Sequence, residues 1–114
     1  MIEHIQQQLF QGSPQAVMVT DLDNNIIQVN PAFEHVSGYS SDEIIGQNPS
    51  VLSAGELAGD FYENVWLELN GTGAWQGELW NRHKNGSVYP AWFNVIKMTD
   101  SVGKPTGSIA QFFN

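Results

Sequence analysis

Residues 30–49 contain two short helices with both of their ends marked, and no other stretch constrains the fold as strongly. Asn30 can cap a helix that begins at the following proline, where the missing N–H costs nothing, and Gly38 can end it in the left-handed conformation. Ser40 or Ser41 can open a second helix, with two acidic residues in its first turn, before another glycine ends it. Helices of about two turns are marginal alone, so they must lie against strands from elsewhere in the chain.

Strand-like segments lie on both sides of this helical stretch. Five segments have the composition or alternation of strands: residues 16–20, 26–29, 76–82, 87–98 and 108–113. A longer helix is expected over residues 59–69, where apolar side chains recur four residues apart. Two strands, then helices, then three strands predict an α+β fold, with a five-stranded antiparallel sheet and its helices on one face.

The beginning of the chain has a different pattern. Apolar side chains follow a helical spacing over a polar glutamine face, so residues 1–11 are predicted to form an amphipathic helix. A Gly-Ser-Pro sequence then breaks this helix. We therefore divide the chain into an N-terminal amphipathic helix, residues 1–12, and one folded domain, residues 13–114.

The charge of the chain is strongly unbalanced, because 12 acidic residues face 4 basic ones and give a net charge of −8. All four basic residues lie in the last third of the sequence. Such a surface repels polyanions, so nucleic acid is not an expected partner. The chain has no cysteine for disulfides or thiolate chemistry, and no apolar run approaches the length of a membrane span. We expect a cytoplasmic location and no membrane contact by this segment.

The residues that could carry out chemistry are dispersed along the sequence. His4, His35 and His83 lack the close partners that metal sites use. No nucleophile elbow and no glycine-rich phosphate loop follows a strand. We therefore expect this domain not to be an enzyme, and its histidines to be surface or partly packed residues.

Several motifs occur in an order that is known from one family. They are Asn30-Pro-Ala-Phe33, Ser37-Gly-Tyr39, Glu43-Ile-Ile-Gly46, Asn48-Pro49, Leu52-Ser53, the run from Trp75 to Gly86, and Tyr89-Pro90. In the order and spacing of these motifs, the chain resembles the PAS sensory domains from Ser13 to its last residue. The resemblance implies a sheet that curls around the helices and leaves a pocket between the two layers.

The resemblance also separates the possible ligands of this pocket. Light-sensing members of the LOV branch need a cysteine where this chain has Pro49, and the residues that hold the flavin phosphate in that branch are Ser50 and Ser53 here. Haem-binding members present a histidine from the long helix, and residues 59–69 contain none. We therefore expect neither LOV-type FMN chemistry nor haem.

FAD is the best single candidate that the resemblance offers. Redox-sensing members that bind FAD are similar to this chain around Leu52, at Trp66 and at Trp75-Gln-Gly77, and Asn81 aligns with an asparagine at the edge of the isoalloxazine ring. The cofactor-binding residues that we predict are Asn48, Ser53, Trp66, Trp75, Asn81, Phe93 and Gln111. A second asparagine of the family is Ala91 here, so one polar contact is missing. The alternatives are an empty pocket, another small ligand, or a purely structural dimerisation module.

Alternation along the strands predicts which side chains face this pocket, because successive residues of a strand point to opposite faces. The side chains expected on the pocket side are those of Asn81, Tyr89, Ala91, Phe93 and Gln111. Trp92 and Asn94, which alternate with them, should face the other way.

Two functions are compatible with these observations. The first is a sensory module of a larger signalling protein, which detects a small ligand or redox state and relays it to a C-terminal output domain. By analogy that output is cyclic-di-GMP turnover of the GGDEF or EAL type. The second is a ligand-free interaction module that sets the dimer geometry of a histidine kinase or cyclase. In either case we expect a homodimer through residues 1–11, which carry the apolar Ile2, Ile5 and Leu9, and through the outer face of the sheet.

Overall fold

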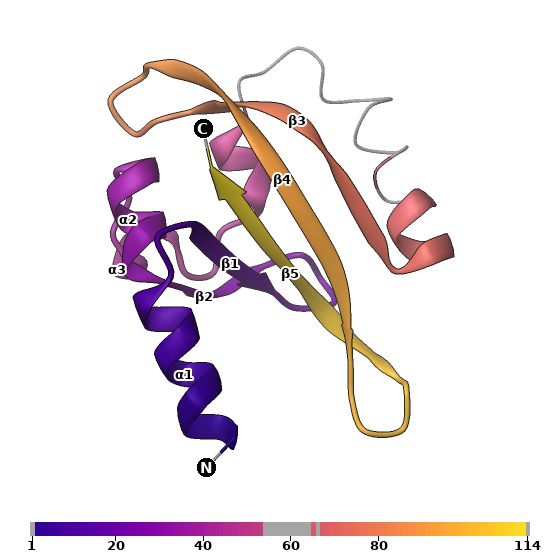
Figure 1. Ribbon diagram of the computed structural model, residues 1–114. Helices are drawn as coiled ribbons and strands as arrows, with labels where there is room; N and C mark the ends of the chain where they lie inside the picture. Colours follow the sequence, from indigo (N-terminus) through magenta and orange to yellow (C-terminus); the bar gives the residue numbers. More distant parts are fainter. Residues whose placement is uncertain (1, 54–64, 66, 114) are drawn as a thin grey trace.

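The computed structural model describes residues 2–53, 65 and 67–113, and it has the predicted α+β fold (Figure 1). The elements are α1 (Ile2–Gly12), β1 (Ala16–Thr20), β2 (Ile26–Val29), α2 (Pro31–Ser37), α3 (Ser41–Ile44), the 3₁₀-helix η1 (Pro49–Leu52), β3 (Ala74–Arg82), β4 (Val88–Thr99) and β5 (Pro105–Phe113). Residues 67–72 are helical as well. The strands form one antiparallel sheet in the order β2-β1-β5-β4-β3.

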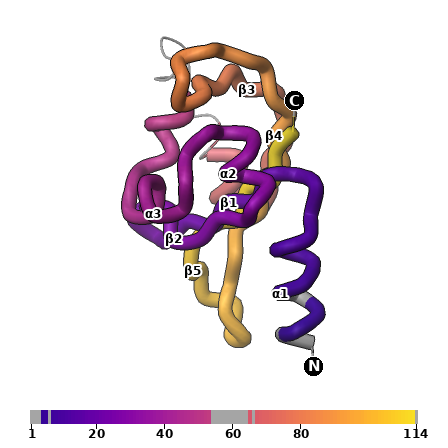
Figure 2. Tube along the Cα trace, turned by 90° about the vertical axis from the view of Figure 1, so that its left-hand side faces the viewer, coloured from indigo at the N-terminus to yellow at the C-terminus, as the bar shows by residue number. Residues whose placement is uncertain are grey.

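The sheet separates two groups of helices. Figure 2 shows α1 on one side of the sheet and α2 and α3 on the other. Phe33 of α2 meets the ring of Phe112 of β5 edge-on, with ring centroids 5.8 Å apart. Phe93 of β4 stacks on the same Phe112 ring at a centroid distance of 4.6 Å. Because Phe33 and Phe112 are fully buried, these aromatic contacts hold α2 over the middle of the sheet.

Most strand boundaries agree with the predicted ones, and the exceptions arise from ladders that extend further than expected. β3 begins at Ala74 and β5 at Pro105, both earlier than predicted, because β4 pairs with them along nearly its whole length. Gly107 allows β5 to pass close to β1, since a Cβ at this position would lie 1.9 Å from the carbonyl oxygen of Thr20. The extra length of β5 therefore depends on a glycine that the alternation pattern does not explain.

The helix expected over residues 59–69 ends later than predicted. Its first half lies outside the described residues, but residues 67–72 are helical and Gly73 ends the helix with a φ of 86°. The N–H of Gly73 donates to the carbonyl oxygen of Leu69 at 2.9 Å, as in a helix stop with a left-handed glycine. The predicted type of helix end is therefore correct, and the predicted end residue is three positions too early.

α2 has both of its predicted ends and α3 has its predicted start, but α3 ends at Ile44 with Ile45 as its C-cap, before the glycine that was expected to end it. Gly38 ends α2 with a φ of 80°, and its N–H donates to the carbonyl oxygen of Glu34. At the start of α3, the Glu43 carboxylate accepts from the N–H of Ser40 at 3.0 Å, and the Ser40 hydroxyl accepts from the N–H of Glu43 at 3.3 Å. This reciprocal pair is a capping box, and it fixes the turn between the two helices.

Asn30 caps α2 and also joins three segments of the chain. Its side chain is fully buried. The Oδ1 atom accepts from the backbone N–H groups of Val17 at 2.9 Å and Phe33 at 3.0 Å. The Nδ2 atom donates to the backbone carbonyl oxygens of Phe10 and Gln15, each at 3.0 Å. One amide therefore uses its full hydrogen-bonding capacity to connect the end of α1, the start of β1 and the start of α2.

The turn between β3 and β4 is attached to the helical layer. The backbone N–H of Lys84 donates to the carbonyl oxygen of Ser37 at 2.9 Å, and its ammonium pairs with the carboxylate of Glu43. The hydrogen bond from Lys84, and then the bond from the backbone of Ser40, lower the pKa of Glu43 to about 2. Because the lowered pKa favours the folded state only while the carboxyl is ionised, this contribution to stability is present above about pH 4.5 and is lost as the pH falls toward 2.

Replacement of Asn30 should destabilise the whole domain. In Asn30→Ala the cap of α2 is lost and buried backbone groups of three segments lose their partner, so we expect the free energy of unfolding to fall by on the order of 3 kcal/mol. Asn48→Ala is the matched control, because Asn48 caps η1 through a single bond to the N–H of Ser50 and should cost only about 1 kcal/mol. Urea denaturation followed by tryptophan fluorescence measures both values, and equal losses would contradict the role given to Asn30.

Candidate functional site

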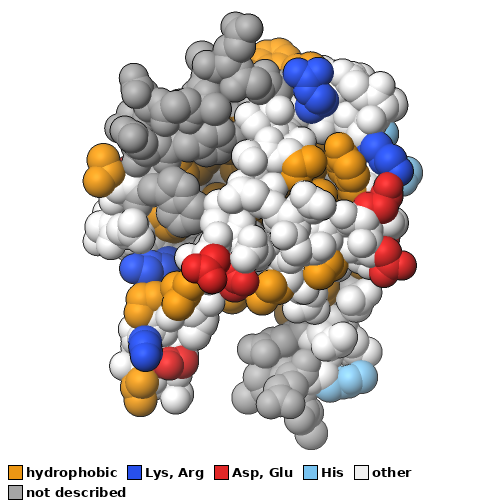
Figure 3. Space-filling model, turned by 180° about the vertical axis from the view of Figure 1, so that it is seen from behind, with side chains coloured by type: hydrophobic (Ala, Val, Ile, Leu, Met, Phe, Trp, Pro, Cys, Tyr) orange, Lys and Arg blue, Asp and Glu red, His pale blue; other side chains and the backbone are white. Residues whose placement is uncertain are grey.

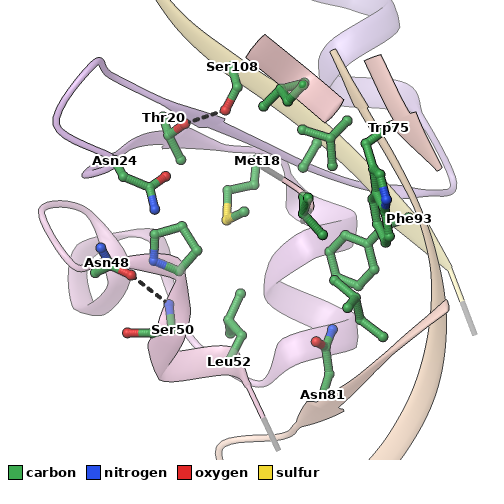
Figure 4. A pocket seen from close by; sticks show the side chains of 16 residues that line it. Met18, Thr20, Asn24, Asn48, Ser50, Leu52, Trp75, Asn81, Phe93 and Ser108 are labelled. Atoms are coloured by element: carbon green, nitrogen blue, oxygen red, sulfur yellow. Dashed lines mark hydrogen bonds between the residues drawn. The ribbon is translucent and has the colours of Figure 1, made fainter. Parts of the chain in front are cut away.

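A cavity of about 320 Å³ lies between the sheet and the helical layer (Figure 4). Its walls are mainly apolar, and polar side chains lie at its two ends. The side chains from the sheet that line it are Met18, Thr20, Trp75, Leu79, Asn81, Phe93, Val95, Ser108 and Ala110. The helical layer and its connections contribute Asn24, Asn48, Pro49, Ser50, Leu52, Val65 and Leu69. This composition is that of a small-molecule site, with apolar walls and a few polar groups that can fix orientation.

Asn81 forms one polar end of the cavity. It is 3% exposed, and its Nδ2 atom has no hydrogen-bond partner among the described residues. Its backbone is fixed from two sides, by an isolated bridge to Ser53 and by the ladder pair with Tyr89. A buried amide donor without a partner costs about 1–3 kcal/mol, so this position is destabilising unless something in the cavity accepts the hydrogen bond.

Tyr89 lies directly across the ladder from Asn81. Burial raises the pKa of the Tyr89 phenol, and the neighbouring Asn81 side chain acts in the opposite direction without reaching hydrogen-bond geometry. The phenol is therefore neutral across the physiological pH range and adds no charge near Asn81.

Trp75 lies over Gly77 in the wall of the cavity. A Cβ added at Gly77 would be 2.6 Å and 2.7 Å from the Cζ2 and Cη2 atoms of the Trp75 indole. The two residues are neighbours on the same face of β3, so the ring can fold back along the strand only because residue 77 has no side chain. The Trp-x-Gly pattern thus has a local physical reason, which is the placement of a flat aromatic ring beside the cavity.

The other polar end contains Thr20 and Ser108, whose hydroxyl oxygens are 2.6 Å apart in a buried hydrogen bond. Asn24, in the β1–β2 turn, lies beside them, and in Figure 4 it appears at the opposite end of the cavity from Asn81. Asn48 completes this side, with its Oδ1 accepting from the N–H of Ser50 at 2.9 Å. The cavity therefore has a single unpaired amide at one end and a group of hydroxyls and amides at the other.

Four of the predicted cofactor-binding residues line the cavity, and burial along β4 follows the predicted alternation. These four are Asn48, Trp75, Asn81 and Phe93. Ala91 and Phe93 are buried while Trp92 is 43% exposed, as the alternation of β4 predicts. Ser53 is not among the described residues that line the cavity, although its backbone pairs with Asn81. Trp66 lies outside the described residues.

The predicted position of Gln111 is wrong. Gln111 pairs directly with Asn94, and residues that lie opposite each other in an antiparallel ladder share a face of the sheet. Ala110 and Phe112 face the core, so Gln111 faces α1 across the outer side of the sheet. Asn94 was expected to point outward, and a residue that pairs with Asn94 must point outward too. The sequence does not show that Gln111 is this residue, because the register between β4 and β5 is not evident from it.

Sequence reasoning missed several residues of the cavity. Met18, Thr20 and Ser108 lie on its sheet wall, and Asn24 lies in the β1–β2 turn. Alternation within β1 could have indicated Met18 and Thr20, but all five residues of β1 are buried, and this hides the pattern. The contact between Thr20 and Ser108 spans 88 residues of sequence and has no local signal.

The described residues give no sign of a metal centre, since no group of three or more His, Cys, Asp or Glu side chains among them could hold a metal ion. His83 instead packs its ring against Gly38, where a Cβ would lie 2.3 Å from the ring. None of the helices in the part of the chain that the structure describes is long and apolar enough to cross a membrane.

A side chain at position 77 should displace the Trp75 ring. In Gly77→Ala the new Cβ would overlap the indole, so we expect a shift of the tryptophan emission and a loss of about 1–3 kcal/mol in the free energy of unfolding. Gly71→Ala is the matched control, because Gly71 is helical with open space around its Cβ position, and it should leave the emission unchanged and be slightly stabilising. Identical emission spectra for wild type and Gly77→Ala would contradict the described packing.

Known proteins share both the sequence pattern and this architecture. The chain is 35% identical over 89 residues to a nitrogen fixation regulatory protein of Klebsiella oxytoca, and 32% identical over 88 residues to the aerotaxis receptor of Escherichia coli K12. The aligned regions cover 78% and 77% of this chain but only 18% and 17% of those proteins, so the chain spans less than a fifth of their length.

Solved structures with the same fold include the PAS domain of a protein from Colwellia psychrerythraea, with a TM-score of 0.94 at 24% identity over 100% of this chain and 97% of that one. An RNA-binding light-oxygen-voltage receptor has a TM-score of 0.85 at 22% identity, over 99% of this chain and 33% of its own. A family model described as a PAS domain matches residues 14–114. With a match over nearly its whole length, the chain belongs to the PAS domain family.

Proposed function

We propose that this domain is the sensory module of a larger signalling protein and that its cavity binds a flavin, with FAD as the cofactor that the resemblance to redox-sensing PAS domains implies. The observation that carries the proposal is Asn81, a buried amide whose N–H group points into an apolar cavity without a partner among the described residues. A ring carbonyl or ring nitrogen of a ligand would accept this hydrogen bond and remove its cost. The domain itself catalyses no reaction in this proposal.

The walls of the cavity suit a flat ring. Trp75 and Phe93 present aromatic surfaces, and Leu52 and Leu79 add aliphatic ones. The edge of an isoalloxazine ring offers both donors and acceptors, which a side-chain amide can match. A volume of about 320 Å³ is at the lower end of the range for small-molecule pockets, so the ring system fits and a whole dinucleotide does not. In bound FAD the part beyond the ring must therefore extend out of the cavity.

The absorption spectrum of the chain, purified without added cofactor and again after incubation with FAD, tests this proposal. We expect the two bands of an oxidised flavin, retained through gel filtration. Asn81→Leu should lose the flavin while its free energy of unfolding stays equal or rises, because a buried unpaired amide is replaced by an apolar group. Gln111→Leu is the matched control on the outer face and should keep the flavin. Absence of flavin from the wild-type chain under both conditions would reject the proposal.

We also propose that the domain forms a homodimer through α1 and the outer face of the sheet. An open groove of about 1000 Å³ lies between them, lined by α1 residues such as Leu9 and by Ile96, Met98 and Ile109 of the sheet. Leu9 is 69% exposed and Ile96 is 54% exposed, which leaves apolar surface that a second copy could cover. In the sensory alternative, such a dimer transmits a change in the cavity to an output domain for cyclic-di-GMP turnover. In the ligand-free alternative, the dimer only sets the geometry of a histidine kinase or cyclase.

Sedimentation of a charged variant in the groove tests the dimer. Leu9→Lys should shift the chain from dimer to monomer at tens of micromolar, since a buried unpaired ammonium at the interface costs several kcal/mol. Leu22→Lys is the matched control, because Leu22 is 67% exposed in the β1–β2 turn, away from the groove. A wild-type chain that sediments as a monomer at these concentrations would reject the dimer, whatever the behaviour of the variants.

A further inference from the structure

Thr20 and Ser108 form a buried pair of hydroxyl groups in the wall of the cavity. The two residues lie directly opposite each other in the ladder between β1 and β5, so their side chains share the cavity face of the sheet. Thr20 is 2% exposed and Ser108 is 7% exposed. Next to Ser108, Gly107 lets β5 approach the backbone of Thr20 closely. The backbones of two strands therefore hold this hydroxyl pair in place.

The hydroxyl pair has one hydrogen more than it has acceptors for. Each hydroxyl group carries one hydrogen to donate and two lone pairs that accept. The hydrogen bond of 2.6 Å between the two oxygens uses one of the two hydrogens, whichever residue is the donor. Neither hydroxyl has a further hydrogen-bond partner in the described part of the chain. One buried hydroxyl hydrogen is therefore left without an acceptor.

The cavity thus has an unpaired hydrogen-bond donor at each of its two ends. The Nδ2 atom of Asn81 is the donor at one end, and the hydroxyl pair lies at the other (Figure 4). Between them the walls are mainly apolar, as at Leu52 and Phe93. Because a buried donor without an acceptor is unfavourable, both ends favour a ligand that brings an acceptor to them.

The acceptor that fits the hydroxyl pair is an uncharged group. None of the described side chains that line the cavity carries a charge. On the face seen in Figure 3, the acidic and basic side chains lie on the outer surface, beside one another. An anion buried next to the hydroxyl pair would have no counter-ion there, which is strongly unfavourable. The oxygen of a hydroxyl or carbonyl group avoids this penalty.

We infer that the Thr20–Ser108 hydroxyl pair is a second polar anchor of the cavity and donates a hydrogen bond to an uncharged oxygen of the ligand. The inference rests on the proposed function and refines it. A flavin whose ring accepts from Asn81 carries its hydroxyl groups on the ribityl chain attached to that ring, and one of them is the acceptor. Riboflavin and FAD share this chain, so the contact is the same in both and does not involve the diphosphate.

The count of hydrogens predicts how variants of the pair behave. Ser108→Ala leaves the hydrogen of Thr20 free, and Thr20→Val leaves the hydrogen of Ser108 free, so each single variant keeps one donor for the ligand. We expect the full chain with either single change to bind riboflavin within about threefold of wild type. The double variant has no donor and should bind riboflavin about tenfold more weakly. Quenching of flavin fluorescence measures these affinities.

The double variant should still fold. Replacement of both partners of a buried hydrogen bond by apolar groups of similar shape is nearly neutral for stability. Lumiflavin, which is the ring without the ribityl chain, has no hydroxyl for the pair to bind, so wild type and double variant should bind it equally. Ser87→Ala is the matched control, because it removes a hydroxyl that donates to Asn85 at 2.7 Å in the exposed β3–β4 turn, and it should leave riboflavin binding unchanged.

The outcomes distinguish this inference from the proposed function. A tenfold loss of riboflavin affinity in either single variant would overturn the second anchor, because one hydrogen remains free there. Unchanged riboflavin affinity in the double variant, or equal losses for riboflavin and lumiflavin, would overturn it as well. All of these results leave the flavin cavity in place. Failure of the wild-type chain to bind riboflavin, lumiflavin or FAD would overturn the second anchor and the proposed function together.

Discussion

The structure depends on the hydrogen bonding of Asn30. Its amide reaches four backbone groups that belong to three separate segments of the chain. Because the amide is fully buried, its four bonds act in a medium where their loss is costly. Asn30 thus ties the start of α2 to β1, and the contact between Phe33 and Phe112 holds the helix over the sheet.

Two buried asparagines in this domain have opposite roles. Asn30 uses every donor and acceptor of its amide, whereas the Nδ2 atom of Asn81 has no partner among the described residues. A saturated amide contributes to stability and specifies one arrangement of the chain. An unsaturated amide at the end of an apolar cavity is unfavourable for stability, which is the usual mark of a group retained for binding. The distinction that we propose between scaffold and binding site therefore rests on the hydrogen bonds of one residue type.

The sequence predicts those parts of the fold that have local causes. The cap at Asn30, the stop at Gly38 and a helix start at one of the two serines, which is Ser40, depend on residues within one turn of each helix, and all three are present. The inward position of Phe93 follows from alternation within one strand. The face of Gln111 could not be predicted because it depends on pairing between β4 and β5, and the contact between Thr20 and Ser108 joins segments that meet only in the folded domain.

The central claim is that Asn81 donates a hydrogen bond to a flavin ring in the cavity. The side-chain NH₂ resonances of a ¹⁵N-labelled chain test it most directly during a titration with riboflavin. The claim predicts a large downfield shift of one Asn81 Nδ2 proton, while the NH₂ protons of Asn30, already hydrogen-bonded at 3.0 Å to two carbonyl oxygens, stay in place. Binding of riboflavin with unchanged Asn81 resonances would contradict the claim.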